Sequence, residues 1–91
     1  MMGKTILVVE DDANLLDVVR HNLAREGYEV VTSRDGEAGI AAARARKPDL
    51  ILLDIMLPQL GGFEVCRILR KETSVPILML TAKTDEVDKV V

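Results

Sequence analysis

The chain has 91 residues, which suits one compact domain near the small end of the usual range and argues against a second. Its core is expected to be aliphatic, because 48% of the residues are hydrophobic but only one Phe, one Tyr and no Trp occur. The 15 acidic and 12 basic side chains give a net charge of -3, and the basic ones are scattered along the sequence. Base-stacking platforms and a DNA-binding surface are therefore not expected, and no direct nucleic-acid contact by this chain is predicted.

The lone Cys66 and the absence of long apolar runs bear on cellular location. A single cysteine cannot form an intramolecular disulfide, which suits a reducing compartment, and within an apolar helical pattern it is expected to be a small buried hydrophobe. No apolar run reaches the ~18 residues of a membrane span, and Met1 to Lys4 leads directly into a strand pattern. We expect a cytoplasmic protein without a membrane segment.

The first third of the chain predicts a strand, a helix and a second strand. Thr5–Val9 is an almost unbroken apolar run, typical of a strand covered on both faces of a parallel sheet. A helix is expected after it, with Asp12 as its N-cap and Gly27 closing it, and with an apolar face made of Leu15, Leu16, Val19 and Leu23. Tyr28–Thr32 alternates between apolar and polar residues, which indicates an edge strand.

A second helix and a buried strand are predicted in the middle of the chain. The helix covers about residues 36–46, with Asp35 before it and Pro48 beyond it. Its small side chains are expected to form one face that allows close packing on a sheet: Ala38, Ala41, Ala42 and Ala45. The apolar run Leu50–Leu53 then predicts a third strand, buried on both faces.

The last third predicts another helix, another strand and the beginning of a helix. Helical spacing relates the apolar residues Val65, Ile68 and Leu69, while Arg67, Arg70 and Lys71 are expected to face water. Pro76–Leu80 predicts a fourth buried strand, and Asp85–Val91 is expected to begin a helix. This alternation predicts an α/β fold with a doubly wound parallel sheet and right-handed crossovers.

Acidic residues follow the predicted strands at the edge where such sheets bind ligands. Glu10, Asp11 and Asp12 follow the first strand, Asp54 follows the third, and Thr81 follows the fourth. Crowded carboxylates repel one another unless a cation compensates them. Helix capping would explain one acid in the first group but hardly three, so this arrangement predicts a site for a hard divalent ion such as Mg²⁺.

The central carboxylate of this arrangement is a candidate nucleophile. Asp54 is placed between the first and fourth strands, and an aspartate can attack phosphorus when a metal ion neutralises the phosphoryl oxygens. Thr81 could donate its hydroxyl to a phosphoryl oxygen and so couple the charge on Asp54 to the segment that follows. The pattern therefore favours phosphate chemistry over a closed structural ion site.

Three segments resemble the signature segments of receiver domains in two-component response regulators. They are Ile6–Asp12, Leu52–Pro58 with Gly62 after it, and Pro76–Ala82, and the likeness extends over essentially the whole chain. The resemblance implies a flavodoxin-like (CheY-like) sheet with strand order 2-1-3-4. The amino-acid sequence around Asp54 is most similar to that of regulators of the OmpR/PhoB type. These carry a winged-helix DNA-binding domain, which is not found among these 91 residues.

The resemblance also implies roles for individual residues. Asp54 would be the phosphoacceptor, Asp11 a direct Mg²⁺ ligand, Glu10 a second acidic ligand acting through water, and Met56 a ligand through its backbone carbonyl. Thr81 would be the switch hydroxyl. The phosphoryl group would come from a sensor histidine kinase, and the chain would catalyse its own phosphorylation and dephosphorylation without being a turnover enzyme.

The sequence departs from the receiver pattern at its carboxyl end. The family continues for about one further βα unit, which supplies a fifth strand, a fifth helix and a lysine that contacts the phosphoryl group. Residues 1–91 are therefore expected to be a receiver domain incomplete at the carboxyl end. A homodimer through the exposed sheet edge or face is predicted from this departure.

Two other functions stay open on the sequence. An aspartate-nucleophile phosphohydrolase usually has a second aspartate two residues after the nucleophile, but Met56 occupies that position. A fragment unable to be phosphorylated could serve only as a dimerisation or interaction module. His21 is expected to be a surface helix residue without a role in phosphate chemistry.

Overall fold

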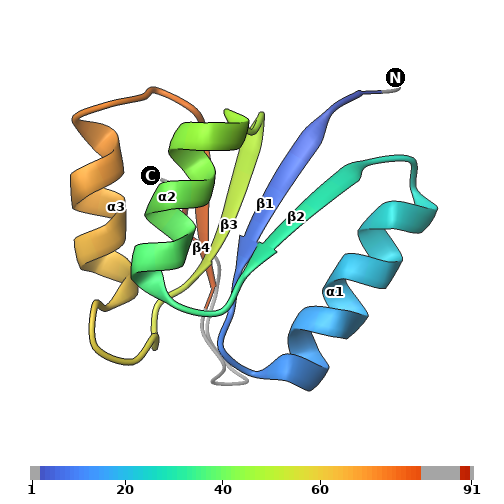
Figure 1. The fold of residues 1–91 in the computed structure, drawn as a ribbon, viewed down its shortest axis with the longest axis horizontal. Coiled ribbons are helices and arrows are strands. Elements are labelled where there is room, and N and C mark those ends of the chain that lie inside the picture. The colour runs from blue at the N-terminus through green and yellow to red at the C-terminus, as the bar shows by residue number, and fades with distance from the viewer. Residues whose placement is uncertain (1–2, 81–88, 91) are drawn as a thin grey trace.

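The computed structural model describes residues 3–80 and 89–90. Its main feature is a sheet with helices on both faces (Figure 1). The elements, in chain order, are β1 (Thr5–Val9), α1 (Ala13–Arg25), β2 (Glu29–Ser33), α2 (Gly36–Arg46), β3 (Leu50–Asp54), α3 (Gly62–Arg70), β4 (Ile77–Leu80) and β5 (Lys89–Val90).

The sheet has the order β2-β1-β3-β4-β5. The first four strands are parallel, so the predicted doubly wound arrangement with the order 2-1-3-4 is confirmed. β1 and β3 lie at the centre, where Val9 pairs with Leu53. This register brings Glu10, which follows β1, and Asp54, which ends β3, to the same edge of the sheet.

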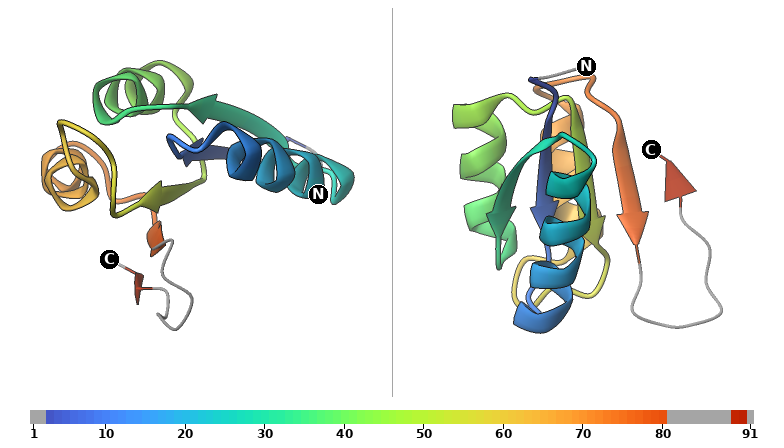
Figure 2. Two further views of the ribbon diagram at one scale, coloured as in Figure 1. Left: turned by 90° about the horizontal axis from the view of Figure 1, so that it is seen from below. Right: turned by 90° about the vertical axis from the view of Figure 1, so that its right-hand side faces the viewer.

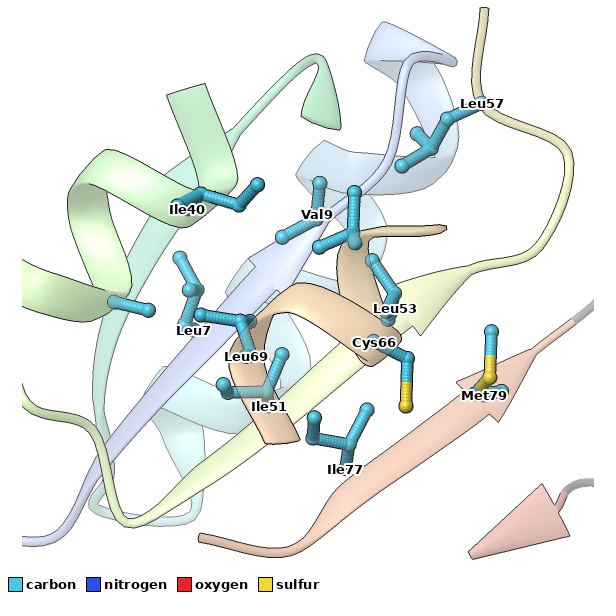
Figure 3. Packing of buried hydrophobic residues seen from close by; sticks show 12 residues of the cluster. Leu7, Val9, Ile40, Ile51, Leu53, Leu57, Cys66, Leu69, Ile77 and Met79 are labelled. Atoms are coloured by element: carbon cyan, nitrogen blue, oxygen red, sulfur yellow. The ribbon is translucent and has the colours of Figure 1, made fainter. Parts of the chain in front are cut away.

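Helices α2 and α3 cover one face of the sheet and α1 covers part of the other (Figures 1 and 2). The larger core cluster lies under α2 and α3 and joins alternate residues of β1, β3 and β4 to the two helices (Figure 3). The smaller cluster, on the opposite face, consists of Ile6, Val8 and Leu16. Both clusters are aliphatic, as the composition predicted, and Cys66 is buried in the larger one.

Helix α1 begins and ends as the sequence predicted. The Asp12 side chain accepts hydrogen bonds from the backbone N–H groups of Asn14 (2.9 Å) and Leu15 (3.1 Å), which satisfies two donors of the first turn. Gly27 has a φ of 98°, a conformation that a glycine adopts without strain. Strand β2 then begins at Glu29, one residue later than expected.

The expected packing face of α2 is wrong, although the helix bounds are correct. The buried residues are Gly36, Gly39, Ile40 and Ala43, whereas Ala38, Ala41 and Ala45 are exposed. The reason is steric, because a β-carbon at position 39 would lie only 2.9 Å from Cγ2 of Val9. Gly39 lets the helix approach β1 closely, while Ala38, Ala41 and Ala45 face water.

Two expectations near the carboxyl end are also corrected. Arg70 does not simply face water, because its side chain is half-buried and donates a hydrogen bond to the backbone carbonyl of Val75. Lys89–Val90 is a short strand that pairs antiparallel with β4, where a helix was expected. The edge of β4 offers unpaired backbone groups, and pairing satisfies them. The remaining residues of that expected helix, 85–88 and 91, lie outside the described part.

Candidate metal centre

The residues that follow β1 form an acidic loop, defined here as Glu10, Asp11 and Asp12. Glu10 extends the strand pairing, because its N–H donates to the carbonyl of Ser33 at 3.0 Å. The N–H of Asp12 donates to Oε2 of Glu10 at 3.0 Å, while the Asp12 carboxylate caps α1. The Asp12 carboxylate is thus used to cap the helix. The carboxylates of Glu10 and Asp11 are the ones in this loop that could bind a ligand.

Asp54 ends β3 and is almost completely buried, with 5% of its surface exposed. Its Oδ1 accepts a hydrogen bond from the N–H of Met56 at 3.0 Å, which fixes the orientation of the carboxylate. The N–H of Ile55 donates to the carbonyl of Leu80 at 2.8 Å, so the chain directly after Asp54 is tied to the end of β4.

The turn after Asp54 is closed by Gly62, the first residue of α3. Its N–H donates to the carbonyl of Ile55 at 3.1 Å. A β-carbon at position 62 would lie 2.7 Å from the α-carbon of Ile55 and would collide with the carbonyl oxygen of Asp54. Glycine at this position therefore lets α3 begin directly against the backbone of Asp54.

Carboxylate oxygens of Glu10, Asp11 and Asp54 all lie within 4.8 Å of one another. These three residues are called the acidic cluster. The electrostatic consequence appears at Glu10, whose pKa is raised to about 7. The main cause is burial, and the nearby carboxylates of Asp54 and Asp11 add to it, whereas the Asp12 N–H acts in the opposite direction.

The acidic cluster fits a hard divalent cation. Mg²⁺ prefers oxygen ligands and is usually held by one or two carboxylates together with water and substrate oxygens. Three converging carboxylates supply such donors, and a bound cation would relieve the repulsion that adds to the effect of burial on the pKa of Glu10.

The structure brings together Glu10, Asp11 and Asp54 of the residues predicted for the site. Met56 contacts this group because its N–H donates a hydrogen bond to Oδ1 of Asp54. The ligand role of its carbonyl oxygen stays a prediction. Thr81 lies outside the described residues, so its predicted hydroxyl contact is not tested. It directly follows Leu80, whose carbonyl is bonded to Ile55.

Sequence reasoning missed Arg34, which lies directly after β2. Its guanidinium donates a hydrogen bond from Nη2 to the backbone carbonyl of Asp11 at 3.0 Å. Two signals in the sequence pointed in this direction. Arg34 follows a strand that was predicted to lie in the same sheet, and it directly precedes Asp35, the N-cap of α2, at the same sheet edge.

An apolar hollow of about 230 Å³ adjoins the acidic cluster on the α1 side of the sheet. It is lined by Glu10, Asp54 and six aliphatic residues of β1, α1, β3 and β4: Val8, Val9, Leu15, Val19, Leu52 and Leu80. Within the described ranges, no helix is long and apolar enough to span a membrane.

Comparison with known proteins finds similar sequences among bacterial regulatory proteins. The chain is 52% identical over 90 residues to the alkaline phosphatase synthesis transcriptional regulatory protein PhoP of Bacillus subtilis, a match that covers 98% of this chain and 38% of that protein. It is 49% identical over 89 residues to the DNA-binding response regulator MtrA of Mycobacterium tuberculosis, covering 98% of this chain and 39% of that protein. The chain thus spans about two fifths of the length of these relatives.

Solved structures agree in fold. The N-terminal domain of a response regulator receiver protein from Methanoculleus marisnigri superposes with a TM-score of 0.84 at 40% identity, covering 90% of this chain and 69% of that one. The BeF3-activated receiver domain of Klebsiella pneumoniae RstA gives a TM-score of 0.85 at 35% identity, covering 91% and 71%. Residues 6–91 match the family described as the response regulator receiver domain, and the chain belongs to that family.

Proposed function

We propose that this chain accepts a phosphoryl group on Asp54 from a sensor histidine kinase and thereby regulates an output. The observation that carries the proposal is the position of Asp54. It is buried at the end of a central strand, oriented by the Met56 N–H, and accompanied by the carboxylates of Glu10 and Asp11 within 4.8 Å. Membership of the receiver family supports the same function.

The acidic cluster would hold Mg²⁺ through Glu10, Asp11 and Asp54, with the backbone carbonyl of Met56 as a further ligand. When bound, the ion would neutralise charge on the phosphoryl oxygens. The Met56 N–H holds Oδ1 of Asp54, which leaves Oδ2 for the attack. A bond forms between Oδ2 and phosphorus, and the bond from phosphorus to the donor nitrogen breaks, with its electron pair leaving on the kinase histidine.

Thr81 is the proposed switch hydroxyl. It follows Leu80, which is bonded through its carbonyl to the residue after Asp54. A hydroxyl at this position would donate to a phosphoryl oxygen on Asp54 and would move the segment after β4. PhoP is a transcriptional regulatory protein and MtrA is a DNA-binding response regulator, which favours transcription as the regulated output.

The chain is proposed to act as a switch and not as a turnover enzyme. Met56 stands two residues after the nucleophile and carries no titratable group that could protonate a leaving alkoxide.

We also propose a homodimer through the sheet face that α1 leaves open. On β4 the half-buried Leu78 and Leu80 alternate with the buried Ile77 and Met79, so they point to that face.

Intact-mass spectrometry with Mg²⁺ and acetyl phosphate tests the proposed function. The unaltered chain is expected to gain one phosphoryl group, and Asp54→Asn is expected to gain none. Asp12→Asn is the matched control, because it removes an acid from the same loop but keeps a side chain that caps α1. A folded, unaltered chain that gains no phosphoryl group would overturn the proposal.

A further inference from the structure

Two successive residues at the end of β2 hold two successive residues of the acidic loop. The carbonyl of Ser33 accepts the N–H of Glu10 at 3.0 Å, and the guanidinium of Arg34 donates to the carbonyl of Asp11 at 3.0 Å. The first contact continues the pairing of β1 with β2, as any residue at position 33 would allow. The second contact depends on the side chain of Arg34.

The backbone of Asp11 has fixed neighbours on both sides. Glu10 is tied to β2, and Asp12 is tied to α1 by capping its first turn. Between them, the Asp11 carbonyl is held by Arg34. The backbone of Asp11 sets the direction of its Cα–Cβ bond, so a group that holds the Asp11 carbonyl restricts the positions that its carboxylate can reach beside Glu10 and Asp54.

Within the described part of the chain, the guanidinium of Arg34 forms no ion pair with an acidic side chain. Arg34 lines a shallow hollow beside α1 together with Arg20 and Asp17. There, Asp17 pairs with Arg20 at 2.6 Å and thus neutralises the other arginine. The guanidinium of Arg34 is left to make a charge-assisted hydrogen bond to the Asp11 carbonyl, which is stronger than a neutral one.

We propose that Arg34 is a positioning residue for the acidic cluster, acting through the backbone of Asp11. This inference rests on the proposed function for its consequence, which is tighter Mg²⁺ binding. It adds to that function a residue outside the acidic cluster, because Arg34 lies in the loop after β2 and contributes no ligand atom. The loop after β2 thereby becomes part of the site's support.

The charge and the hydrogen bond of Arg34 have opposite effects on cation affinity. Its positive charge repels Mg²⁺, so its removal would tighten binding if charge dominated. Its hydrogen bond holds a ligand residue in place, so its removal would weaken binding if positioning dominated. The charge effect is screened strongly at high salt, because the Debye length falls from about 10 Å at 0.1 M to about 3 Å at 1 M.

Amide hydrogen exchange without magnesium tests whether Arg34 holds the loop. The reporter is the N–H of Asp12, which is bonded to Glu10 within the loop. We expect Arg34→Met to accelerate its exchange about fivefold, as the loss of one hydrogen bond implies. Arg34→Lys keeps a donor and a charge and should recover part of the protection. Unchanged exchange at Asp12 in Arg34→Met would overturn the proposal.

Calorimetric titration with Mg²⁺ at high salt tests the consequence. Arg34→Met is expected to bind Mg²⁺ about tenfold more weakly, and Arg34→Lys is expected to recover part of the loss. Arg25→Met, which removes a charge at the far end of α1, should leave the affinity unchanged. Equal or tighter binding in Arg34→Met would overturn the positioning role. If the unaltered chain binds no Mg²⁺, the proposed function fails, while the exchange data still decide whether Arg34 holds the loop.

Discussion

Glu10 is the residue at which the electrostatics of the acidic cluster can be measured. Its pKa is raised from 4.5 to about 7, so the folded chain holds this proton more tightly than the unfolded chain. The contribution of Glu10 to stability is therefore fully present below pH 4.5 and is lost as the pH rises through about 7. The effect belongs to the magnesium-free protein.

Glu10→Gln should remove this pH dependence. We expect the variant, without magnesium, to be more stable than the unaltered chain at pH 8 by about 1 kcal/mol, because half-exposure to water reduces the full effect of the shift. Urea unfolding between pH 4.5 and 8 measures the difference. Glu37→Gln, on the exposed part of α2, serves as the control. Parallel pH profiles of Glu10→Gln and the unaltered chain would contradict the assignment.

Two adjacent glycines give a matched test of the turn beside Asp54. A β-carbon at position 62 would collide with the backbone of Asp54 and Ile55, whereas one at position 61 would meet nothing within 4 Å. Gly62→Ala should therefore cost about 1–3 kcal/mol of unfolding free energy, as overpacking usually does, and Gly61→Ala should change it far less. Equal effects of the two substitutions in denaturant unfolding would show that α3 does not begin directly against Asp54.

The acidic cluster could be predicted from the sequence because strand order and strand ends determine it. Glu10, Asp11 and Asp54 follow apolar runs, and parallel strands bring such positions to one edge. Asp12 was predicted as the N-cap of the first helix, and the structure confirms this, because an aspartate directly before an apolar helical pattern is a common capping residue. Arg34 was missed since long side chains on a loop have many possible partners.

At the scale of elements, α3 is the helix whose start can be improved. Its N-cap, Gly61, has an extended backbone and makes no side-chain capping bond, unlike Asp12 of α1 and Asp35 of α2. Gly61→Asp should stabilise the chain by about 0.5–1 kcal/mol, through a new capping acceptor and a less flexible unfolded state. Thermal unfolding measures the gain, and Gly61→Ala separates capping from the backbone effect. A loss of stability in Gly61→Asp would contradict this reading of the helix start.

The bounds of the elements could be predicted well, and the packing face of α2 could not. Capping aspartates, glycines and apolar runs mark the ends of α1, α2 and the parallel strands locally. The face of α2 depends on how closely the helix approaches its neighbours, and two glycines permit this: Gly39 lies against Val9, and Gly36 lies against Leu60 and Val65. An apolar pattern favours alanines over glycines for the core face, whereas in this helix Gly36 and Gly39 are buried and Ala38, Ala41 and Ala45 are exposed.

At the scale of the whole molecule, the folded state and the cation site are linked. An ion that binds only the folded chain stabilises it by about 2.7 kcal/mol at a concentration of 100 times its Kd. For a domain of this size, each kcal/mol raises the Tm by about 4–8 °C. We expect Mg²⁺ to raise the Tm of the unaltered chain and to have a much smaller effect on Asp11→Asn. An equal rise in both proteins would place the ion elsewhere.

General rules of chain connection predicted the parallel, doubly wound arrangement of residues 5–80, and the resemblance to receiver domains implied the strand order. The pairing of Lys89–Val90 with β4 could not be predicted in this way. A segment of two residues carries no periodic pattern, and its conformation is decided by the open edge beside it. Local propensity is weak where a sheet edge supplies unpaired backbone groups.

The central claim is that the phosphoryl group resides on Asp54. Its most direct test is to phosphorylate the chain with acetyl phosphate and Mg²⁺, reduce the acyl phosphate with borohydride, and map the altered residue by peptide mass spectrometry. The account predicts one altered residue, at position 54. Reduction at Glu10, Asp11 or Asp12 instead, or no altered residue in a chain shown to be folded, would contradict it.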